Sequence, residues 1–422
     1  MSQTETILFS TLLQLIVIVL GARLAGTLAR RMGQSRSVGE IVVGLLLGPS
    51  LLGHVAPDVS AVLFNRSAGP AVMILSQIGL ILLLFQIGSD FEFGHLRHTR
   101  NRAAVLGVAA GSVGVPFVLG VAIGYASAPV LAPSIDSLTY SLFVGVALAI
   151  TALPILGRIL REFDLTRTPI GVVAISAAAL NDVSGWVMLA AVSAYAAARF
   201  SVEYTVLQVG GIVAFGLLLW FVGRPAVDRL LRAFPVVGGH VPPALMAIIL
   251  AMLFGLAICT SLLGIFAIFG GFAAGLLLHR HLEFVAAWRT QVGQLVLVFF
   301  LPIFFTYTGL RTNVLGLVSA SDWTWCAIIL AAATLGKIVP VYIAARATGF
   351  NHDESSILGM LMNTRALMEL IVLNIGFDLG FIPQQVFTML VVMAVVTTVM
   401  TAPALRLLLP RVGHAIPLQV EA

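Results

Sequence analysis

The decisive stretch of the sequence is AAALNDVSGW, residues 177–186, which places one carboxylate in the middle of a long apolar run. About a dozen apolar or small residues lie on each side of Asp182. A hydrocarbon core of roughly 30 Å needs about 20 apolar residues per helix, and residues 169–197 meet that length. A charge at membrane depth costs about 2.5–3.5 kcal/mol or more and usually faces a bundle interior or a wet cavity. The stretch therefore predicts a membrane helix that bears a functional acid.

The composition extends this expectation to the whole chain. Of the 422 residues, 59% are hydrophobic and 10% are charged, whereas soluble domains average about 45–50% apolar and about 25% charged residues. So few charges cannot cover a water-facing surface, so we expect lipid to be the solvent for most of the chain. The net charge is +5, and the basic residues are spread singly through short loops. This pattern does not indicate nucleic acid as a partner. Cys259 and Cys326 lie in apolar segments without metal-ligand spacing.

Thirteen apolar segments are long enough, or nearly long enough, to cross a bilayer. We therefore predict an all-α polytopic membrane protein with one membrane domain, residues 1–409, and a short cytoplasmic tail, residues 410–422, with no attached regulatory domain. The expected spans lie near residues 6–28, 38–53, 70–91, 103–126, 138–160, 169–197, 205–222, 243–262, 264–280, 294–311, 322–346, 355–377 and 384–408.

Loop charges test this assignment independently. Alternate loops and the C-terminal end hold most of the arginines, namely Arg30, Arg31, Arg36, Arg97, Arg100, Arg102, Arg158, Arg161, Arg167, Arg224, Arg229, Arg232, Arg280, Arg289, Arg346, Arg406 and Arg411. The intervening loops hold only Arg66, Arg199 and Arg311. The positive-inside rule makes the arginine-rich side cytoplasmic. We expect an integral protein of the inner cell membrane with its N-terminus outside and its C-terminus in the cytoplasm.

Several further charges lie inside the expected spans. Lys337 is the single lysine of the chain and lies mid-span. Arg365 and Glu369 are four residues apart, which places them on one face of a helix where they can neutralise each other. Glu40 begins the second span. For these four residues we expect a charge-compensating or gating role, and the alternative for each is a purely structural ion pair or an interfacial position.

The chemistry of Asp182 gives the functional hypothesis. A buried carboxylate binds a cation or a proton, but hardly both at once in a low-dielectric site. This mutual exclusion is the physical basis of cation/proton exchange. The alternative is a structural carboxylate that is permanently paired with a buried base such as Lys337.

Two segments interrupt their helices at mid-depth. Residues 149–154 end in Pro154, which removes a helical hydrogen bond and disfavours helical geometry in the preceding residue. The polar stretch 363–365 lies at similar depth, seven spans later. An odd offset reverses orientation in the membrane, so residues 5–197 and 243–409 are expected to form two inverted repeats with broken crossing helices, joined by a linker helix at 205–222. Secondary transporters are often built this way, with the substrate site at the interruptions.

The sequence resembles the monovalent cation/proton antiporter superfamily, in the branch of Kef-type and plant cation/H+ exchangers. The similarity covers nearly the whole membrane chain. It is found at GEIVVGLLLGP (39–49), TALP (151–154), LND (180–182), GIFAIFGGF (264–272), LPIFF (301–305), Lys337, NTR (363–365) and ELIVLN (369–374).

The resemblance implies a homodimer formed through scaffold helices and a mobile six-helix transport unit that moves the ion by an elevator-type shift. It makes Asp182 the shared cation and proton site and places Thr151 in the crossing that supplies oxygen ligands. Asn181 and Ser184 complete the expected ion-binding set. Relatives that move net charge have an aspartate at the position of Asn181, so the resemblance implies electroneutral exchange of one K+ or Na+ for one H+. Ala366 stands where many members have glycine.

Two other functions remain open on the same fold. A passive cation channel needs a pore with repeated binding positions, and no filter-like repeat of glycines or ring of acids is present. A symporter or exporter of an organic solute needs aromatic and amide contacts, whereas the central segments are mostly small and aliphatic. We expect no enzymatic activity, because the spans contain no paired His, Ser-His or HExxH pattern. We expect no cofactor beyond the transported H+ and Na+ or K+.

Overall fold

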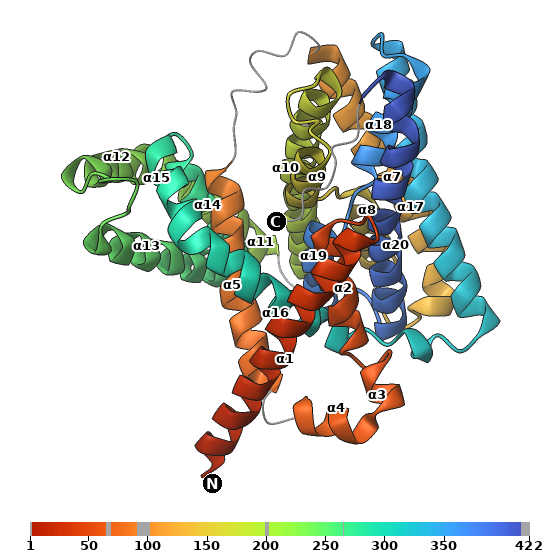
Figure 1. Ribbon diagram of the computed structural model, residues 1–422, viewed down its shortest axis with the longest axis horizontal. Helices are drawn as coiled ribbons and strands as arrows, with labels where there is room; N and C mark the ends of the chain where they lie inside the picture. The colour runs from red at the N-terminus through yellow and green to blue at the C-terminus, as the bar shows by residue number, and fades with distance from the viewer. Residues whose placement is uncertain (1, 65–68, 91–101, 199–201, 265, 415–422) are drawn as a thin grey trace. The chain divides into compact units, whose positions relative to one another are not determined.

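The structure is a computed structural model that describes residues 2–64, 69–90, 102–198, 202–264 and 266–414 (Figure 1). Every long regular element in these residues is a helix, and the β-type pairing they contain is one isolated bridge between Val237 and His240. The all-α prediction is therefore confirmed. Part of the expected tail, residues 415–422, lies outside the described residues, as do four loop arginines, Arg66, Arg97, Arg100 and Arg199.

Eleven helical segments are long and apolar enough to cross a membrane. They are residues 4–31, 69–89, 102–131, 137–162, 169–196, 210–233, 243–262, 296–316, 320–347, 352–378 and 384–412. The number thirteen is not confirmed, because two expected spans form shorter helices, α2 (Arg36–Leu46) and α14 (Ala267–Leu278). The 11 residues of α2 extend about 16 Å, about half of a hydrocarbon core. Helix α2 stops just before Gly48 and Pro49, and proline disfavours helical geometry in the residue that precedes it.

The helices gather into two compact units. Unit 1 comprises residues 1–20, 59–92 and 193–307, and unit 2 comprises residues 21–58, 93–192 and 308–422. Each unit takes segments from both halves of the chain, so the units cut across the two expected repeats.

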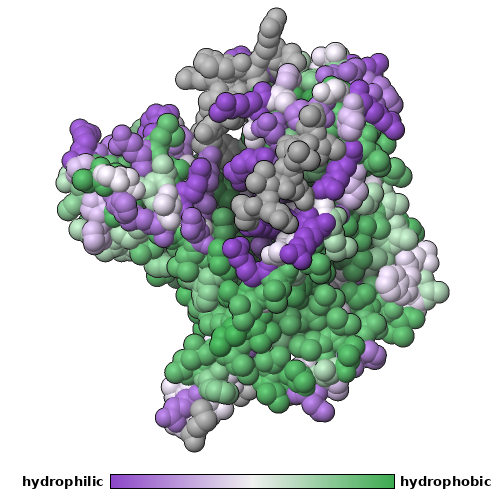
Figure 2. Space-filling view, in the orientation of Figure 1, coloured by the Kyte–Doolittle hydropathy of each residue, from purple (hydrophilic) through white to green (hydrophobic). Residues whose placement is uncertain are grey.

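Unit 1 is built around the contact of α5 (Gly69–Ser89) with α14. A methyl group on Gly271 would lie 2.5 Å from the carbonyl oxygen of Ile81, so only glycine lets the two backbones approach this closely. The Phe85 ring packs at 4.6 Å between ring centroids on Trp288, which ends α15 (Leu282–Trp288). The other helices of this unit are α4 (Pro57–Leu63), α11 (Val202–Leu218), α12 (Arg224–Ala233), α13 (Pro243–Leu262), most of α16 (Leu301–Leu310) and the first part of α1 (Gln3–Arg31). Within this unit, hydrophilic surface gathers over α12 and α15 (Figure 2).

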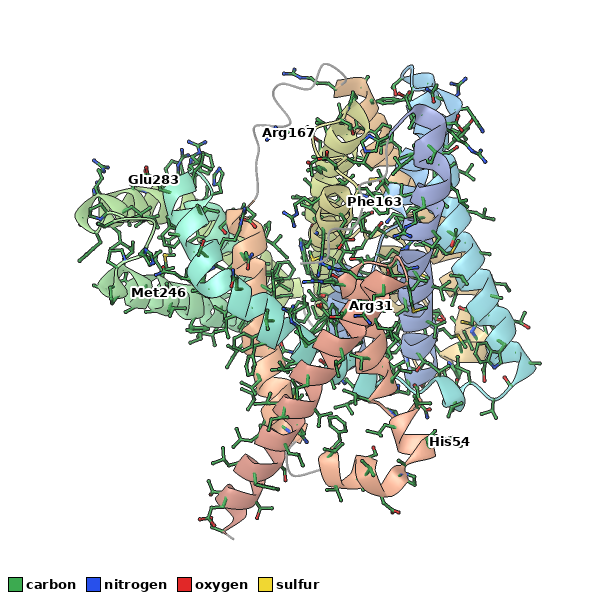
Figure 3. The ribbon with its side chains drawn as sticks, in the orientation of Figure 1. Arg31, His54, Phe163, Arg167, Met246 and Glu283 are labelled. Carbon is green, nitrogen blue, oxygen red and sulfur yellow. The ribbon has the colours of Figure 1, made fainter. Side chains whose placement is uncertain are left out.

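Unit 2 contains the helices with the buried charges. In chain order they are α2, α3 (Leu52–Val55), α7 (Arg102–Leu131), α8 (Ser137–Ala149), α9 (Leu153–Glu162), α10 (Pro169–Ala198), α17 (Ala320–Ala347), α18 (His352–Met362), α19 (Leu367–Asp378) and α20 (Gln384–Leu408). Helix α7 packs against both α8 and α17. Phe163 and Arg167 lie in the short connection between α9 and α10 (Figure 3).

Local capping fixes where three of these helices begin. The Asp136 carboxylate accepts a hydrogen bond from the Thr139 amide at the start of α8, at 2.8 Å. Ser319 with Asp322 and Asn351 with Glu354 form reciprocal capping boxes at the starts of α17 and α18. These polar caps satisfy orphan backbone N–H groups and mark each helix start.

Candidate ion-binding site

The first broken helix of unit 2 is α8–α9. Helix α8 ends at Ala149, residues 150–152 are non-helical, and α9 begins at Leu153. Pro154 lies in the first turn of α9, where its missing N–H costs no helical hydrogen bond. The predicted interruption at 149–154 is confirmed.

The second broken helix, α18–α19, touches the first at the interruptions. Helix α18 ends at Met362 and α19 begins at Leu367. The Ala152 amide donates to the Thr364 carbonyl at 3.1 Å, and the Thr151 hydroxyl donates to the Met362 carbonyl at 3.4 Å. Hydrogen bonds at the two interruptions thus join segments that are more than 200 residues apart in the sequence. These bonds hold four helix ends near one another.

Asp182 lies in the middle of the unbroken helix α10 and is 3% exposed. Neither of its carboxylate oxygens accepts a hydrogen bond from a side chain that the structure describes. The backbone N–H of Leu153, which begins α9, interacts favourably with the carboxylate. A helix N-terminus has a partial positive charge, which favours an anion but does not neutralise it. Asp182 is therefore a buried acid whose charge no described side chain neutralises.

Asn181 connects this carboxylate to the interruption of α8–α9. Its amide nitrogen donates to the Thr151 hydroxyl at 3.0 Å and to the Ser112 hydroxyl at 2.8 Å. These two bonds fix the amide orientation and leave its oxygen without a partner among the described residues. Sequence analysis missed Ser112, on α7, because its one signal is a small polar residue in an apolar run.

Lys337, on α17, is fully buried and holds the end of α8. Its ammonium group donates to the carbonyls of Ala149 and Ile150, at 2.7 and 2.5 Å. These two bonds satisfy carbonyl oxygens at the end of α8, and the predicted charge-compensating role of Lys337 stays a prediction. In the described part of the chain no ion pair joins Lys337 to Asp182, so the carboxylate is not held by the lysine in this structure.

Arg365 and Glu369 are both fully buried and form an ion pair at 3.7 Å. Arg365 also donates to the carbonyls of Ala147 (3.2 Å) and Ala333 (2.9 Å). The expectation that both residues share one helix is wrong, because Arg365 lies in the unwound stretch before α19. The pair instead links that stretch to the first turn of α19.

Comparison with known proteins identifies the family. A family model described as "Sodium/hydrogen exchanger, transmembrane" matches residues 16–409. The chain belongs to the sodium/hydrogen exchanger family. This exchanger also has the fold of a solved sodium proton antiporter, MjNhaP1 from Methanocaldococcus jannaschii, with a TM-score of 0.62 at 15% identity over 97% of this chain and 98% of that one.

Curated relatives of the exchanger come from bacteria, plants and yeast. It is 37% identical to the Na(+)/H(+) antiporter NhaS4 of Synechocystis over 97% of its own length and 100% of the relative's. It is 36% identical to Cation/H(+) antiporter 17 of Arabidopsis thaliana and 28% identical to K(+)/H(+) antiporter 1 of Saccharomyces cerevisiae, over 93% and 90% of this chain. It spans about half the length of these last two relatives, 47% and 44%.

Two of the exchanger's predicted site residues have polar contacts outside the interruptions of the broken helices. The Ser184 hydroxyl donates to the Leu180 carbonyl of its own helix at 2.8 Å, so its place in the ion site stays a prediction. Glu40 lies 4.0 Å from Arg158, near the far end of α9. Among the described residues no group of three or more His, Cys, Asp or Glu side chains lies together. The site instead presents one carboxylate with amide and hydroxyl oxygens, which suit hard cations.

Proposed function

We propose that this protein exchanges a monovalent cation, Na+ or K+, for protons across a membrane, with Asp182 as the site that both ions share. The observation that supports the proposal most strongly is a buried carboxylate that pairs with no side chain of the described residues and faces the backbone N–H of Leu153, in the first of two broken helices that cross. The family and the names of its relatives agree with this activity.

The stoichiometry follows from the groups beside Asp182. Asn181 does not ionise, and the Lys337 ammonium is engaged by two carbonyl oxygens. One carboxylate therefore changes its proton occupancy in each cycle. Binding one cation displaces one proton, so we propose electroneutral exchange.

The movement that exposes the site to each side is proposed to be an elevator-type shift of unit 2. Six of the eleven spans have most of their length in this unit, namely residues 102–131, 137–162, 169–196, 320–347, 352–378 and 384–412. Both broken helices and every buried charge of the site lie among them. We propose unit 1 as the scaffold, through which two copies form a homodimer in the inner cell membrane.

Substitution of the shared acid tests the proposal. In proteoliposomes with an imposed pH gradient, Asp182→Asn is expected to abolish proton flux that depends on added cation, because the amide has the shape of the acid but cannot ionise. Glu283→Gln, an exposed acid in the first turn of α15 (Figure 3), serves as the matched control and is expected to keep full flux. Undiminished cation-dependent flux in Asp182→Asn would refute the assignment. Titration with Li+, Na+, K+ and Rb+ identifies the transported cation.

A further inference from the structure

Asn363 is a fully buried amide that finds no partner. It is 0% exposed, and neither its oxygen nor its nitrogen makes a hydrogen bond to a residue that the structure describes. Leaving a buried polar group unsatisfied is energetically costly. Buried polar groups are nearly always paired, so an amide that is unpaired at both atoms needs an explanation such as a missing ligand.

Another buried asparagine of unit 2, Asn374, has the hydrogen-bond partners that a structural role requires. Asn374, on α19, donates to the Thr308 hydroxyl at 2.8 Å and to the Leu370 carbonyl at 2.9 Å. Its oxygen accepts from the Arg311 guanidinium at 3.0 Å. Asn374 is therefore satisfied on both atoms by the protein, and Asn363 is not.

The backbone places Asn363 in the crossing itself. The residue before it, Met362, accepts the Thr151 hydroxyl, and the residue after it, Thr364, accepts the Ala152 amide. The Thr151 hydroxyl in turn accepts the amide of Asn181, the neighbour of Asp182. Asn363 thus lies between the two bonds that join the broken helices, and two hydrogen bonds through Thr151 connect its neighbour Met362 to the carboxylate helix.

The unpartnered oxygens of this region come from both sides of the crossing. Helix α10 supplies the carboxylate of Asp182 and the amide oxygen of Asn181, and Asn363, the residue after the end of α18, supplies its amide oxygen. We propose that the Asn363 amide oxygen is a ligand of the transported cation, contributed by the second broken helix. This inference rests on the proposed function. It makes Asn363 a residue that determines cation affinity and selectivity without binding the proton.

The distinction between a neutral ligand and the shared acid gives the test. In proteoliposomes, Asn363→Ala is expected to raise the apparent KM for the preferred cation about tenfold, which corresponds to about 1.4 kcal/mol of lost binding. The relative rates with Li+, Na+, K+ and Rb+ are expected to change. The pH at which exchange is half-maximal under saturating cation is expected to stay close to that of the unsubstituted protein, because Asn363 does not bind the proton. Asn374→Ala, the matched control, is expected to keep the cation preference.

A second variant and a second measurement distinguish weaker cation binding from misfolding. Asn363→Ser keeps a small polar group, and thermal unfolding of the detergent-purified protein with and without each cation measures binding directly. The cation is expected to stabilise the unsubstituted protein clearly and Asn363→Ser only weakly. Unchanged apparent KM, selectivity and cation stabilisation in the Asn363 variants, with Asp182→Asn inactive, would overturn this inference alone. An active Asp182→Asn variant would instead overturn the proposed function.

Discussion

Ala366 has an unusual backbone conformation for a residue with a side chain. Its φ of 56° and ψ of −102° lie outside the regions that L-residues favour, and it directly precedes the first residue of α19. Such a conformation costs on the order of 1–3 kcal/mol, and it persists only where the surroundings enforce it. Here the enforcing contacts are the hydrogen bonds that pin Thr364 and Arg365 on the preceding side.

Replacement of Ala366 by glycine is expected to relieve this strain. Glycine adopts positive φ freely but costs about 0.5–1 kcal/mol more conformational entropy on folding. We expect the free energy of unfolding of Ala366→Gly to stay equal or to rise by up to about 2 kcal/mol. Thermal unfolding in detergent measures the difference. The control is Ala152→Gly, because Ala152 lies in the other interruption and has an ordinary φ of −95°. We expect Ala152→Gly to lower the free energy of unfolding. A lower free energy of unfolding in Ala366→Gly would contradict the backbone strain at Ala366.

The sequence identified some residues of the crossing and not others, for a physical reason. Asp182 and Pro154 are visible because a charge or a proline in an apolar run is costly wherever the run folds. Ser112 is an ordinary small polar residue in the sequence, and Asn363 is visible there only as part of the polar stretch 363–365. Their importance lies in which atoms remain unpaired after folding, and that depends on segments far apart in the chain.

At the scale of elements, one arginine connects the end of α9 to α2. The Arg158 guanidinium donates to the Ser37 hydroxyl at 2.6 Å and lies 4.0 Å from Glu40 and 3.6 Å from Glu162. The Glu40 side chain is 13% exposed, so its charge is only partly screened by water. The sequence suggested a role for Glu40 but could not name its partner, because α2 and α9 are more than 100 residues apart.

A double-mutant cycle measures this connection. We expect Arg158→Gln and Glu40→Gln each to destabilise the protein, and the double variant to lose less than the sum, with a coupling of about 1 kcal/mol. The measurement is thermal unfolding of the four proteins under identical detergent and salt. Arg161→Gln, exposed on the same helix, is the control and is expected to change stability little. Additive effects of the two substitutions would show that the ion pair contributes nothing.

For the whole molecule, the length of α2 conflicts with the loop charges. Helix α2 is too short to span a bilayer by itself, yet arginine-rich residues 30–36 precede it and an arginine-poor connection follows it. The positive-inside rule therefore requires the chain to change sides between α1 and α4. Turns and one short helix, α3, occupy residues 47–55. The number of crossings was predicted from the lengths of apolar segments. Apolar length cannot distinguish one long helix from a short helix that is followed by apolar turns.

Cysteine labelling decides whether this crossing exists. In a background with Cys259 and Cys326 replaced by serine, we expect His54→Cys to react with an impermeant maleimide in intact cells. Arg31→Cys, at the end of α1, is expected to react only after permeabilisation. Both positions are marked in Figure 3. Reaction of both cysteines from the same side would show that α2 re-enters instead of crossing, and the assignment of the N-terminus to the outside would need revision.

The hydrogen bonds of the Lys337 ammonium group have a consequence for the charge that a variant protein would move. Two backbone oxygens converge on its nitrogen at 2.7 and 2.5 Å, distances that a dehydrated alkali ion also accepts. A neutral side chain at this position leaves those oxygens unclaimed beside the crossing. Under the exchange proposed above, a variant that binds a second alkali ion there in place of the ammonium group is expected to move a different net charge in each cycle.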